Sequence, residues 1–199
     1  MLKKDIFLGK ERGTVEIEAK KAGRNCDSFA DMDAMAEVLL LFGGDQGDPR
    51  SIFEQAERSI EDRIGKVLAV SREHWTEPWG FQSDRLFLNK ALIVRTGSAP
   101  GEVLAQCLSI ERELGRTRHA GSRNSSRPID LDILLIGNTV LAEGDLQVPH
   151  PRMHLRHFAL APSADIAPDW VHPVLGISVI GLLAALPPQH RSAGIVKKP

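Results

Sequence analysis

The sequence has few cysteines and no long apolar segment, and these shortages exclude several classes of protein. Its two cysteines, Cys26 and Cys107, show neither a metal-ligand spacing nor a secreted disulfide pattern. Reduced thiols and a cytoplasmic location are therefore expected. The longest apolar run, 38–42, is far shorter than the roughly 20 residues of a transmembrane helix. Residues 1–10 lack the apolar core of a signal peptide, so no membrane partner is expected.

An excess of either charge is also missing. The chain has 25 Lys and Arg against 26 Asp and Glu, for a net charge of -1. A chain this balanced lacks the global basic field of a general nucleic-acid binder, so we expect no nucleic-acid partner. Any site for a polyanion must arise from local clustering of arginines. Hydrophobic residues make up 42% of the chain, which is enough for a sizeable core and argues against wholesale disorder.

The 199 residues exceed the roughly 100–150 that one compact domain usually needs. Residues 1–34 interleave lysines with acids and contain no recognisable chemistry. A weak strand, a flexible arm and the remnant of an upstream module all remain open for them. We expect one domain over residues 35–186 and a loose C-terminal tail over 187–199.

Hydrophobic periodicity predicts alternating strands and helices within that domain. We expect strands at 38–42, 67–71, 87–95 and 129–136, and helices at 49–64, 100–115 and 179–186. Asp48 and Pro49 suit the cap and the first turn of the first helix. Gly137 and Asn138 are typical of a hairpin turn leading into 140–141. The order strand, helix, strand, strand, helix, strand predicts an α+β, ferredoxin-like fold, an antiparallel sheet with helices packed on it.

The strongest chemical signal is the sequence Asp130-Leu131-Asp132 within a predicted strand. Residues i and i+2 of a strand share a face, so both carboxylates point one way while Leu131 points into the core. Two such charges repel each other unless a cation lies between them. Hard oxygen ligands of this kind suit Mg²⁺, which also takes phosphate oxygens from a substrate. Two solvated acids at a strand edge are the plain alternative for this motif in isolation.

Arginines surround this acidic pair in the sequence. Their planar forks match phosphate oxygens, and several forks around one metal form a polyphosphate clamp. His150, held between prolines, can donate a hydrogen bond to phosphate or transfer a proton, and we favour donation. Solvated arginines remain the alternative for any single member. The arginines are Arg116, Arg118, Arg123, Arg127, Arg152 and Arg156.

The glycine-rich segment 43–48 lacks the lysine and hydroxyl residues of a Walker motif. Its glycines more plausibly make a tight turn or let the backbone approach a flat ligand. Segments 76–80 and 87–89 supply aromatic faces and the amide of Asn89, which can stack on and hydrogen-bond a heterocycle. Core packing is the alternative for Phe87.

Taken together, these segments resemble the 6-hydroxymethyl-7,8-dihydropterin pyrophosphokinases of folate biosynthesis, with matching order and spacing from about residue 37 to 186. The motifs are FGGDQGD at 42–48, TEPWG at 76–80, FLN at 87–89, GRTR at 115–118, RPIDLDIL at 127–134 and VPHPR at 148–152.

The resemblance implies a ferredoxin-like fold and transfer of pyrophosphate from ATP to the hydroxymethyl group of a reduced pterin, with AMP as the second product. It implies two Mg²⁺ ions bridged by Asp130 and Asp132, and catalytic roles for these aspartates with Arg116 and Arg127. The positions that match the family's ATP site are Glu111, Arg116, Arg118, Arg127, Ile133, His150 and Arg156. Those that match its pterin pocket are Gly43, Thr76, Trp79, Phe87, Asn89 and Phe158.

Some positions depart from the family pattern. Residues 121–126 have no aromatic residue, although many relatives place one there. Asp45 replaces a usual asparagine, His119 a common lysine, and Asp145 an arginine of some relatives. We expect these changes to alter substrate affinity and the loop 116–127, which is interpreted as a lid, and to leave the metal centre intact.

Two other functions remain open. One is a different Mg²⁺-dependent phosphoryl enzyme, such as a nucleotidyltransferase, although no basic surface or extra domain for its acceptor is evident. The other is a nucleotide-binding module without catalysis, against which Thr76, Phe87 and Asn89 argue. The expected partners are small molecules, and the protein is expected to be a monomer or a weak homodimer. Residues 1–34 lie outside the resemblance. Because some folate enzymes are fused to their neighbours in the pathway, one interpretation of residues 14–23 is that they are the end of a dihydroneopterin aldolase-like module.

Overall fold

The computed structural model describes residues 35–80, 84–117 and 125–188. The N-terminal extension expected at 1–34 lies outside the described residues, as does the tail from 189 onward. None of the helices in the three described ranges has both the length and the apolar character needed to cross a membrane.

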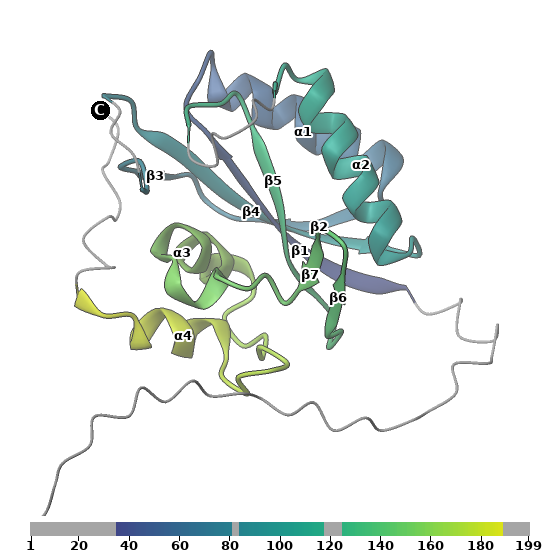
Figure 1. The fold of residues 1–199 in the computed structure, drawn as a ribbon, viewed down its shortest axis with the longest axis vertical. Helices are drawn as coiled ribbons and strands as arrows, with labels where there is room; N and C mark the ends of the chain where they lie inside the picture. Colours follow the sequence, from purple (N-terminus) through teal and green to yellow (C-terminus); the bar gives the residue numbers. More distant parts are fainter. Residues whose placement is uncertain (1–34, 81–83, 118–124, 189–199) are drawn as a thin grey trace, which may run out of the picture. The chain divides into compact units, whose positions relative to one another are not determined.

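A five-stranded antiparallel sheet forms the centre of the domain (Figure 1). Its strands are β1 (Ala36–Gly44), β2 (Lys66–Val70), β3 (His74–Thr76), β4 (Phe87–Thr96) and β5 (Asp130–Ile136). Four of them lie in the order β2-β4-β1-β5, and β3 pairs with β4 beside them. The central strand β1 pairs with β4 along its whole length, from Ala36 opposite Thr96 to Gly44 opposite Leu88.

Two helices follow the first and fourth strands along the chain, α1 (Pro49–Arg63) and α2 (Pro100–Glu113). Each connects two strands that have another strand between them in the sheet, as the ferredoxin-like fold requires. The predicted α+β, ferredoxin-like class is thus confirmed. The acidic residue before α1 is only partly as predicted, because Asp48 is the N-cap residue but its side chain makes no capping hydrogen bond.

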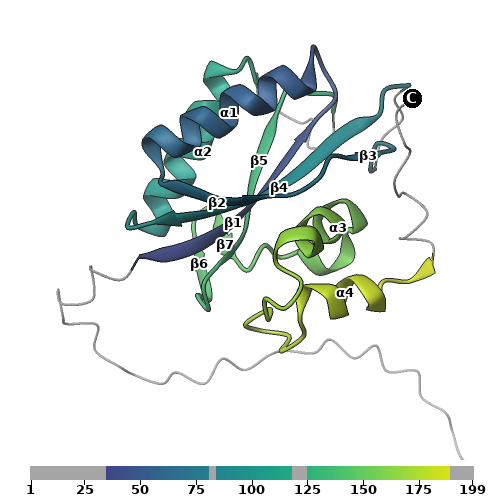
Figure 2. The ribbon, with the colours of Figure 1, turned by 180° about the vertical axis from the view of Figure 1, so that it is seen from behind.

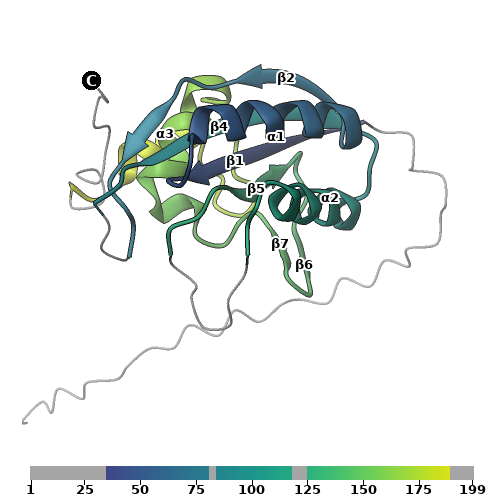
Figure 3. The same cartoon turned by 90° about the horizontal axis from the view of Figure 1, so that it is seen from above.

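Helices cover both faces of the sheet (Figures 1–3). α1 and α2 pack on one face, and α3 (His157–Ile166) and α4 (Val179–Ala185) pack on the other. Alternate residues of β1 serve the two layers, since successive side chains of a strand point to opposite faces. Leu40 and Phe42 belong to the apolar core under α1 and α2, and Leu39 belongs to the core under α3 and α4. The continuous apolar run of β1 is therefore explained by burial on both sides.

Three local predictions differ from the structure. Strand β3, which ends at Thr76, is not among the strands that the sequence predicted. The hairpin expected from the turn at 137–138 does not form with β5, because β6 (Leu141–Glu143) pairs with β7 (Leu146–Val148). Helix α3 was missed because its histidine and Pro162 are typical of loops; Pro162 nevertheless lies inside the helix.

Gly44 allows the end of β1 to approach the residues before β5. A Cβ atom at this position would lie 2.3 Å from the carbonyl oxygen of Pro128 and 3.3 Å from a ring carbon of Phe53. The first distance is a clash with backbone, which cannot rotate away as a side chain can. The sequence suggested two roles for the glycines of segment 43–48, a tight turn or a close approach of the backbone to a flat ligand. Gly44 does allow a close approach, but the group that it approaches is the backbone at Pro128 and not a ligand.

We expect Gly44→Ala to lower the free energy of unfolding by about 1–3 kcal/mol, as overpacked sites typically do. Urea denaturation measures this change. Gly101→Ala is the matched control, because a Cβ atom on Gly101 of α2 meets nothing within 4 Å. The control is expected to change stability by no more than about 1 kcal/mol, in the stabilising direction. Equal destabilisation by both variants would contradict the clash at Gly44.

Candidate active site

The two aspartates of β5 lie side by side on one face of an outer strand. Asp130 pairs with Gly43 and Asp132 with Leu41 of β1. Leu131 between them is 4% exposed and belongs to the core under α1 and α2. Both carboxylates line the same cleft on the opposite face. The alternation that the sequence predicted for this strand is confirmed.

Arginine side chains neutralise the carboxylate of Asp130. Arg127 Nη2 lies 2.8 Å from Asp130 Oδ2, and Arg116 Nη1 forms an ion pair with Asp130 Oδ1. Arg156 approaches the second aspartate, with Nη1 4.0 Å from Asp132 Oδ2. Three of the arginines that flank the motif in the sequence therefore converge on it in space.

Glu111 of α2 contacts both Arg116 and strand β5. Its side chain is almost fully buried, forms an ion pair with Arg116, and accepts a 2.8 Å hydrogen bond from the backbone N–H of Leu131. Hydrogen-bonding an acid to a strand in this way fixes the strand relative to the helix. The contacts of Glu111 thus support Arg116 and β5, in addition to lining a cleft beside β5.

The environment changes the ionisation of two residues in the site. Burial, together with the charge of Asp130, raises the pKa of Asp132 to about 6. Burial, together with the charges of Arg156 and Arg152, lowers the pKa of His150 to about 4, so His150 is neutral at pH 7. Its Nδ1 accepts a 3.1 Å hydrogen bond from the N–H of Arg152, so the ring proton is on Nε2.

A cleft opens in front of the aspartates. Rings from separate elements form its walls: the Trp79 and Phe158 ring centroids are 6.1 Å apart. Asn89 of β4 donates a 2.9 Å hydrogen bond to Thr76 Oγ1. All six residues expected at a pterin lie in this lining, namely Gly43, Thr76, Trp79, Phe87, Asn89 and Phe158.

Two of the arginines also contact these aromatic rings. The guanidinium carbon of Arg127 lies 5.6 Å from the Phe87 centroid, and that of Arg156 lies 5.4 Å from the Phe158 centroid. Such cation–π contacts orient a guanidinium without occupying all its donors. The same two arginines therefore join the aromatic part of the cleft to its acidic part.

A second cleft lies on the other side of the aspartates and shares Asp130, Asp132 and His150 with the first. Leu104 and Leu108 of α2 give it an apolar wall. Two further residues that were expected at a nucleotide, Glu111 and Ile133, line it as well, and so does Asp145. Arg116, also expected there, lines neither cleft. Arg118 and most of the expected lid at 116–127 lie outside the described residues.

Asp45 has a role that the sequence did not reveal. Its carboxylate accepts hydrogen bonds from the Arg127 N–H at 2.7 Å and from the Ser126 hydroxyl at 2.6 Å. Its own N–H donates to the Arg127 carbonyl at 3.0 Å. Asp45 therefore fixes the backbone from which the Arg127 side chain reaches Asp130. The signals available in the sequence were its glycine-rich context and its replacement of the family's usual asparagine.

Comparison with known proteins identifies the family of the chain. A family model described as 7,8-dihydro-6-hydroxymethylpterin-pyrophosphokinase matches residues 39–168. The chain belongs to this family. A 2-amino-4-hydroxy-6-hydroxymethyldihydropteridine pyrophosphokinase of Porphyromonas gingivalis is 41% identical over 141 residues, which are 70% of this chain and 95% of that protein. One of Bacillus subtilis is 38% identical over 130 residues, which are 65% of this chain and 77% of that protein.

The pyrophosphokinase domain also occurs within longer chains. Folic acid synthesis protein FOL1 of Dictyostelium discoideum is 30% identical over 178 residues, or 89% of this chain but 27% of that protein. The crystal structure of wild-type Plasmodium falciparum HPPK-DHPS matches with a TM-score of 0.62 at 15% identity. That match covers 76% of this chain and 44% of the other, so it supports the fold alone.

We expect Asp45→Ala in this pyrophosphokinase to lower the free energy of unfolding by about 1–3 kcal/mol, because two partly buried donors lose their acceptor. Asp45→Asn is the matched control: it keeps one acceptor for the Arg127 N–H, and the Ser126 hydroxyl can turn to accept from the amide. For Asn we expect a loss below about 1 kcal/mol. Urea denaturation separates the two, and an equal loss for Ala and Asn would show that these hydrogen bonds do not matter.

Proposed function

We propose that this pyrophosphokinase transfers the pyrophosphoryl group of ATP to the hydroxymethyl group of 6-hydroxymethyl-7,8-dihydropterin, with AMP as the leaving product, in folate biosynthesis. The observation that supports this most directly is the position of Asp130 and Asp132. The pair lies between an aromatic cleft suited to a flat heterocycle and a second cleft with an apolar wall. Two substrates bound there would meet at the carboxylates.

The donor set fits magnesium, and we propose two Mg²⁺ ions at this pair. Among the described residues, no group of three or more histidine, cysteine or acidic side chains is placed to hold a metal ion. An ion at Asp130 and Asp132 would therefore complete its coordination with phosphate oxygens and water, which is the usual mode of Mg²⁺. When bound, Mg²⁺ neutralises phosphate charge and orients the reacting groups. The raised pKa of Asp132 supports this proposal, because a bound cation would stabilise the ionised carboxylate.

The arginines and His150 would bind the phosphates. Arg127 and Arg156 line the cleft next to the aspartates, and their forks suit phosphate oxygens. They would stabilise the charge that builds on the transferred group and on the departing AMP. His150 would donate its Nε2–H to a phosphate oxygen. Arg116, held by Glu111, would share in this role together with Arg118, and Ile133 would contact the nucleotide.

The aromatic cleft would hold the pterin. Trp79, Phe87 and Phe158 offer ring faces for stacking. The Asn89 amide nitrogen already donates to Thr76, which leaves Oδ1, on the side facing Gly43, to accept from the N–H groups of a pterin. The ring would thus be held by both faces and by one edge, with its hydroxymethyl group toward the aspartates.

We further propose that residues 35–186 form the pyrophosphokinase domain and contain the whole site. Every described residue assigned to it lies between 41 and 158. Because one chain supplies both clefts, activity requires no second subunit, and a monomer or weak homodimer in the cytoplasm is our proposal. Small molecules would be its partners, with neither nucleic acid nor membrane.

Product analysis tests the reaction. We expect AMP to form from ATP only when hydroxymethyldihydropterin and Mg²⁺ are both present, because the chain must transfer the β- and γ-phosphates together. Chromatography of the nucleotides measures this. Reactions lacking the pterin or treated with EDTA are the controls. Formation of ADP would refute pyrophosphoryl transfer, and release of pyrophosphate would indicate a nucleotidyltransferase.

Substitution of the aspartates tests the metal site. We expect Asp130→Asn and Asp132→Asn each to lower kcat by about 10²–10³-fold, the usual effect of removing one group that stabilises transition-state charge. Asp62→Asn is the matched control, since Asp62 is exposed on α1 and lines neither cleft. Steady-state kinetics with circular dichroism of each variant measures the effect. Full activity in either aspartate variant would refute the proposed role of the pair.

A further inference from the structure

Strand β3 is short for an element that forms part of a binding cleft. It has three residues and pairs only with β4 along the described chain, with His74 opposite Asn89 and Thr76 opposite Phe87. Strands this short have little stability of their own. Other contacts must therefore fix the position of Thr76 in the cleft.

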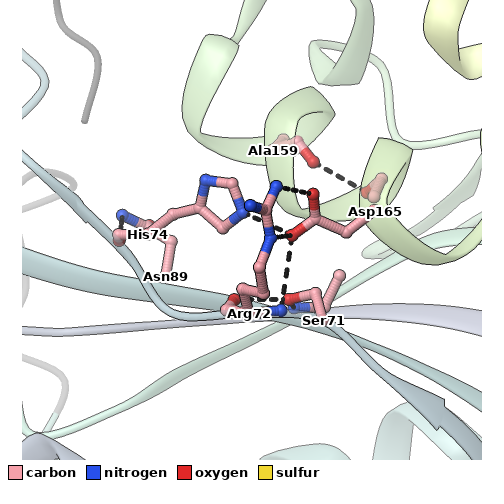
Figure 4. Close-up of polar contacts among 8 residues, drawn as sticks. Ser71, Arg72, His74, Asn89, Ala159 and Asp165 are labelled. Carbon is pink, nitrogen blue, oxygen red and sulfur yellow. Dashed lines mark hydrogen bonds and ion pairs between the residues drawn. The ribbon is translucent and has the colours of Figure 1, made fainter.

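One such contact joins β3 to helix α3 across the sheet face. His74 Nε2 lies 2.7 Å from Asp165 Oδ2, and the His74 side chain is 5% exposed (Figure 4). A hydrogen bond to a carboxylate is about twice as strong as one between neutral groups, and here water is largely excluded. The His74–Asp165 pair is thus a strong, specific link between two elements that are far apart in the sequence.

Arg72 shares the same carboxylate from the solvent side. Its Nη2 lies 2.6 Å from Asp165 Oδ1, and its backbone N–H donates to Oδ2 at 3.3 Å. Burial raises the pKa of Asp165, but the hydrogen bonds from Arg72 and His74 outweigh it, so the pKa lies below its usual value. Asp165 is therefore ionised at neutral pH. The Arg72 side chain is 82% exposed, so its ion pair is open to solvent, unlike the histidine.

The two elements that this pair joins both supply residues to the lining of the aromatic cleft. Thr76 is two residues after His74 on β3, and it accepts the hydrogen bond from Asn89. Phe158 is in the first turn of α3, about 10 Å along the helix from Asp165 at 1.5 Å per residue. Neither His74 nor Asp165 lines the cleft. A shift of α3 against β3 would nevertheless change the spacing between Phe158 and Thr76.

We propose that His74 and Asp165 are positioning residues that set the spacing of the pterin cleft, and hence the affinity for the pterin. This inference rests on the proposed function. The pair joins β3 to the last turns of α3, whereas the aspartates of β5 are positioned by their pairing with β1, and the second cleft is walled by α2. Arg156 at the start of α3 is only one of several groups proposed to bind ATP. Loss of the pair is therefore expected to weaken pterin binding much more than ATP binding, a separation that a general loss of structure would not produce.

The test measures KM for each substrate, and pterin affinity by calorimetry with a non-hydrolysable ATP analogue and Mg²⁺. In His74→Leu, which fills the site without a donor, we expect pterin affinity to fall about tenfold, the effect of one lost charge-assisted hydrogen bond. The KM for ATP should change less than about twofold. His74→Gln restores a donor and should recover most of the affinity. Arg72→Ala is the matched control and should change it less than about twofold.

A double-mutant cycle tests whether the residues act together. Because they form one contact, His74→Leu with Asp165→Ala should weaken pterin binding no more than either change alone. Additive losses would overturn the proposal, as would equal increases in both KM values or unchanged pterin affinity in His74→Leu. Should His74→Leu fail to fold, Asp165→Asn is measured instead, and unchanged affinity there overturns the proposal while weaker pterin binding with normal ATP binding supports it.

Measurements on the wild-type protein distinguish a failure of this proposal from a failure of the proposed function. If the wild type neither binds the pterin nor forms AMP, the proposed function fails. If it does both and the variants match it, only the role of the His74–Asp165 pair is refuted.

Discussion

Repulsion between two carboxylates on one face of β5 is the constraint around which the site is arranged. Asp130 and Asp132 cannot both be ionised in a partly buried cleft unless positive charge lies close by. In the structure that charge comes from Arg116, Arg127 and Arg156. The same arginines are suited to phosphate, so the groups that stabilise the acidic pair without ligands are those that would meet the nucleotide. The arginines that stabilise the folded acidic pair are thus the same ones that would bind a polyphosphate.

The sheet supplies the rigidity that this charge cluster requires. β1 is buried on both faces, and it separates β5 from β4, which presents Phe87 and Asn89. The acidic and aromatic parts of the site are therefore held at a fixed register on the two strands that flank β1. Helix α3 closes the cleft from the other side, and the His74–Asp165 pair joins that helix to the short strand β3.

Features that depend on local pattern were predicted well. The alternation of Asp130, Leu131 and Asp132 follows from the two-residue period of a strand, and the helix starting at Pro49 follows from apolar spacing and from the proline in its first turn. Helix α3 was missed because its proline suggests a loop, whereas its burial against the sheet outweighs that preference. The hairpin expected after β5 was wrong. Residues typical of a turn predict that the chain reverses direction, but they do not determine which strand it then pairs with.

The sequence by itself determined the fold class, the acidic pair with its arginines, and the resemblance to the pterin pyrophosphokinases, since each depends on residues that are near neighbours in the chain or on short motifs in a fixed order. Only the tertiary structure decided that Asp45 holds the backbone of Arg127 and that His74 meets Asp165. Those contacts join residues more than 80 positions apart. No period or motif encodes such a pairing, because it arises only when the sheet has brought the separate elements together.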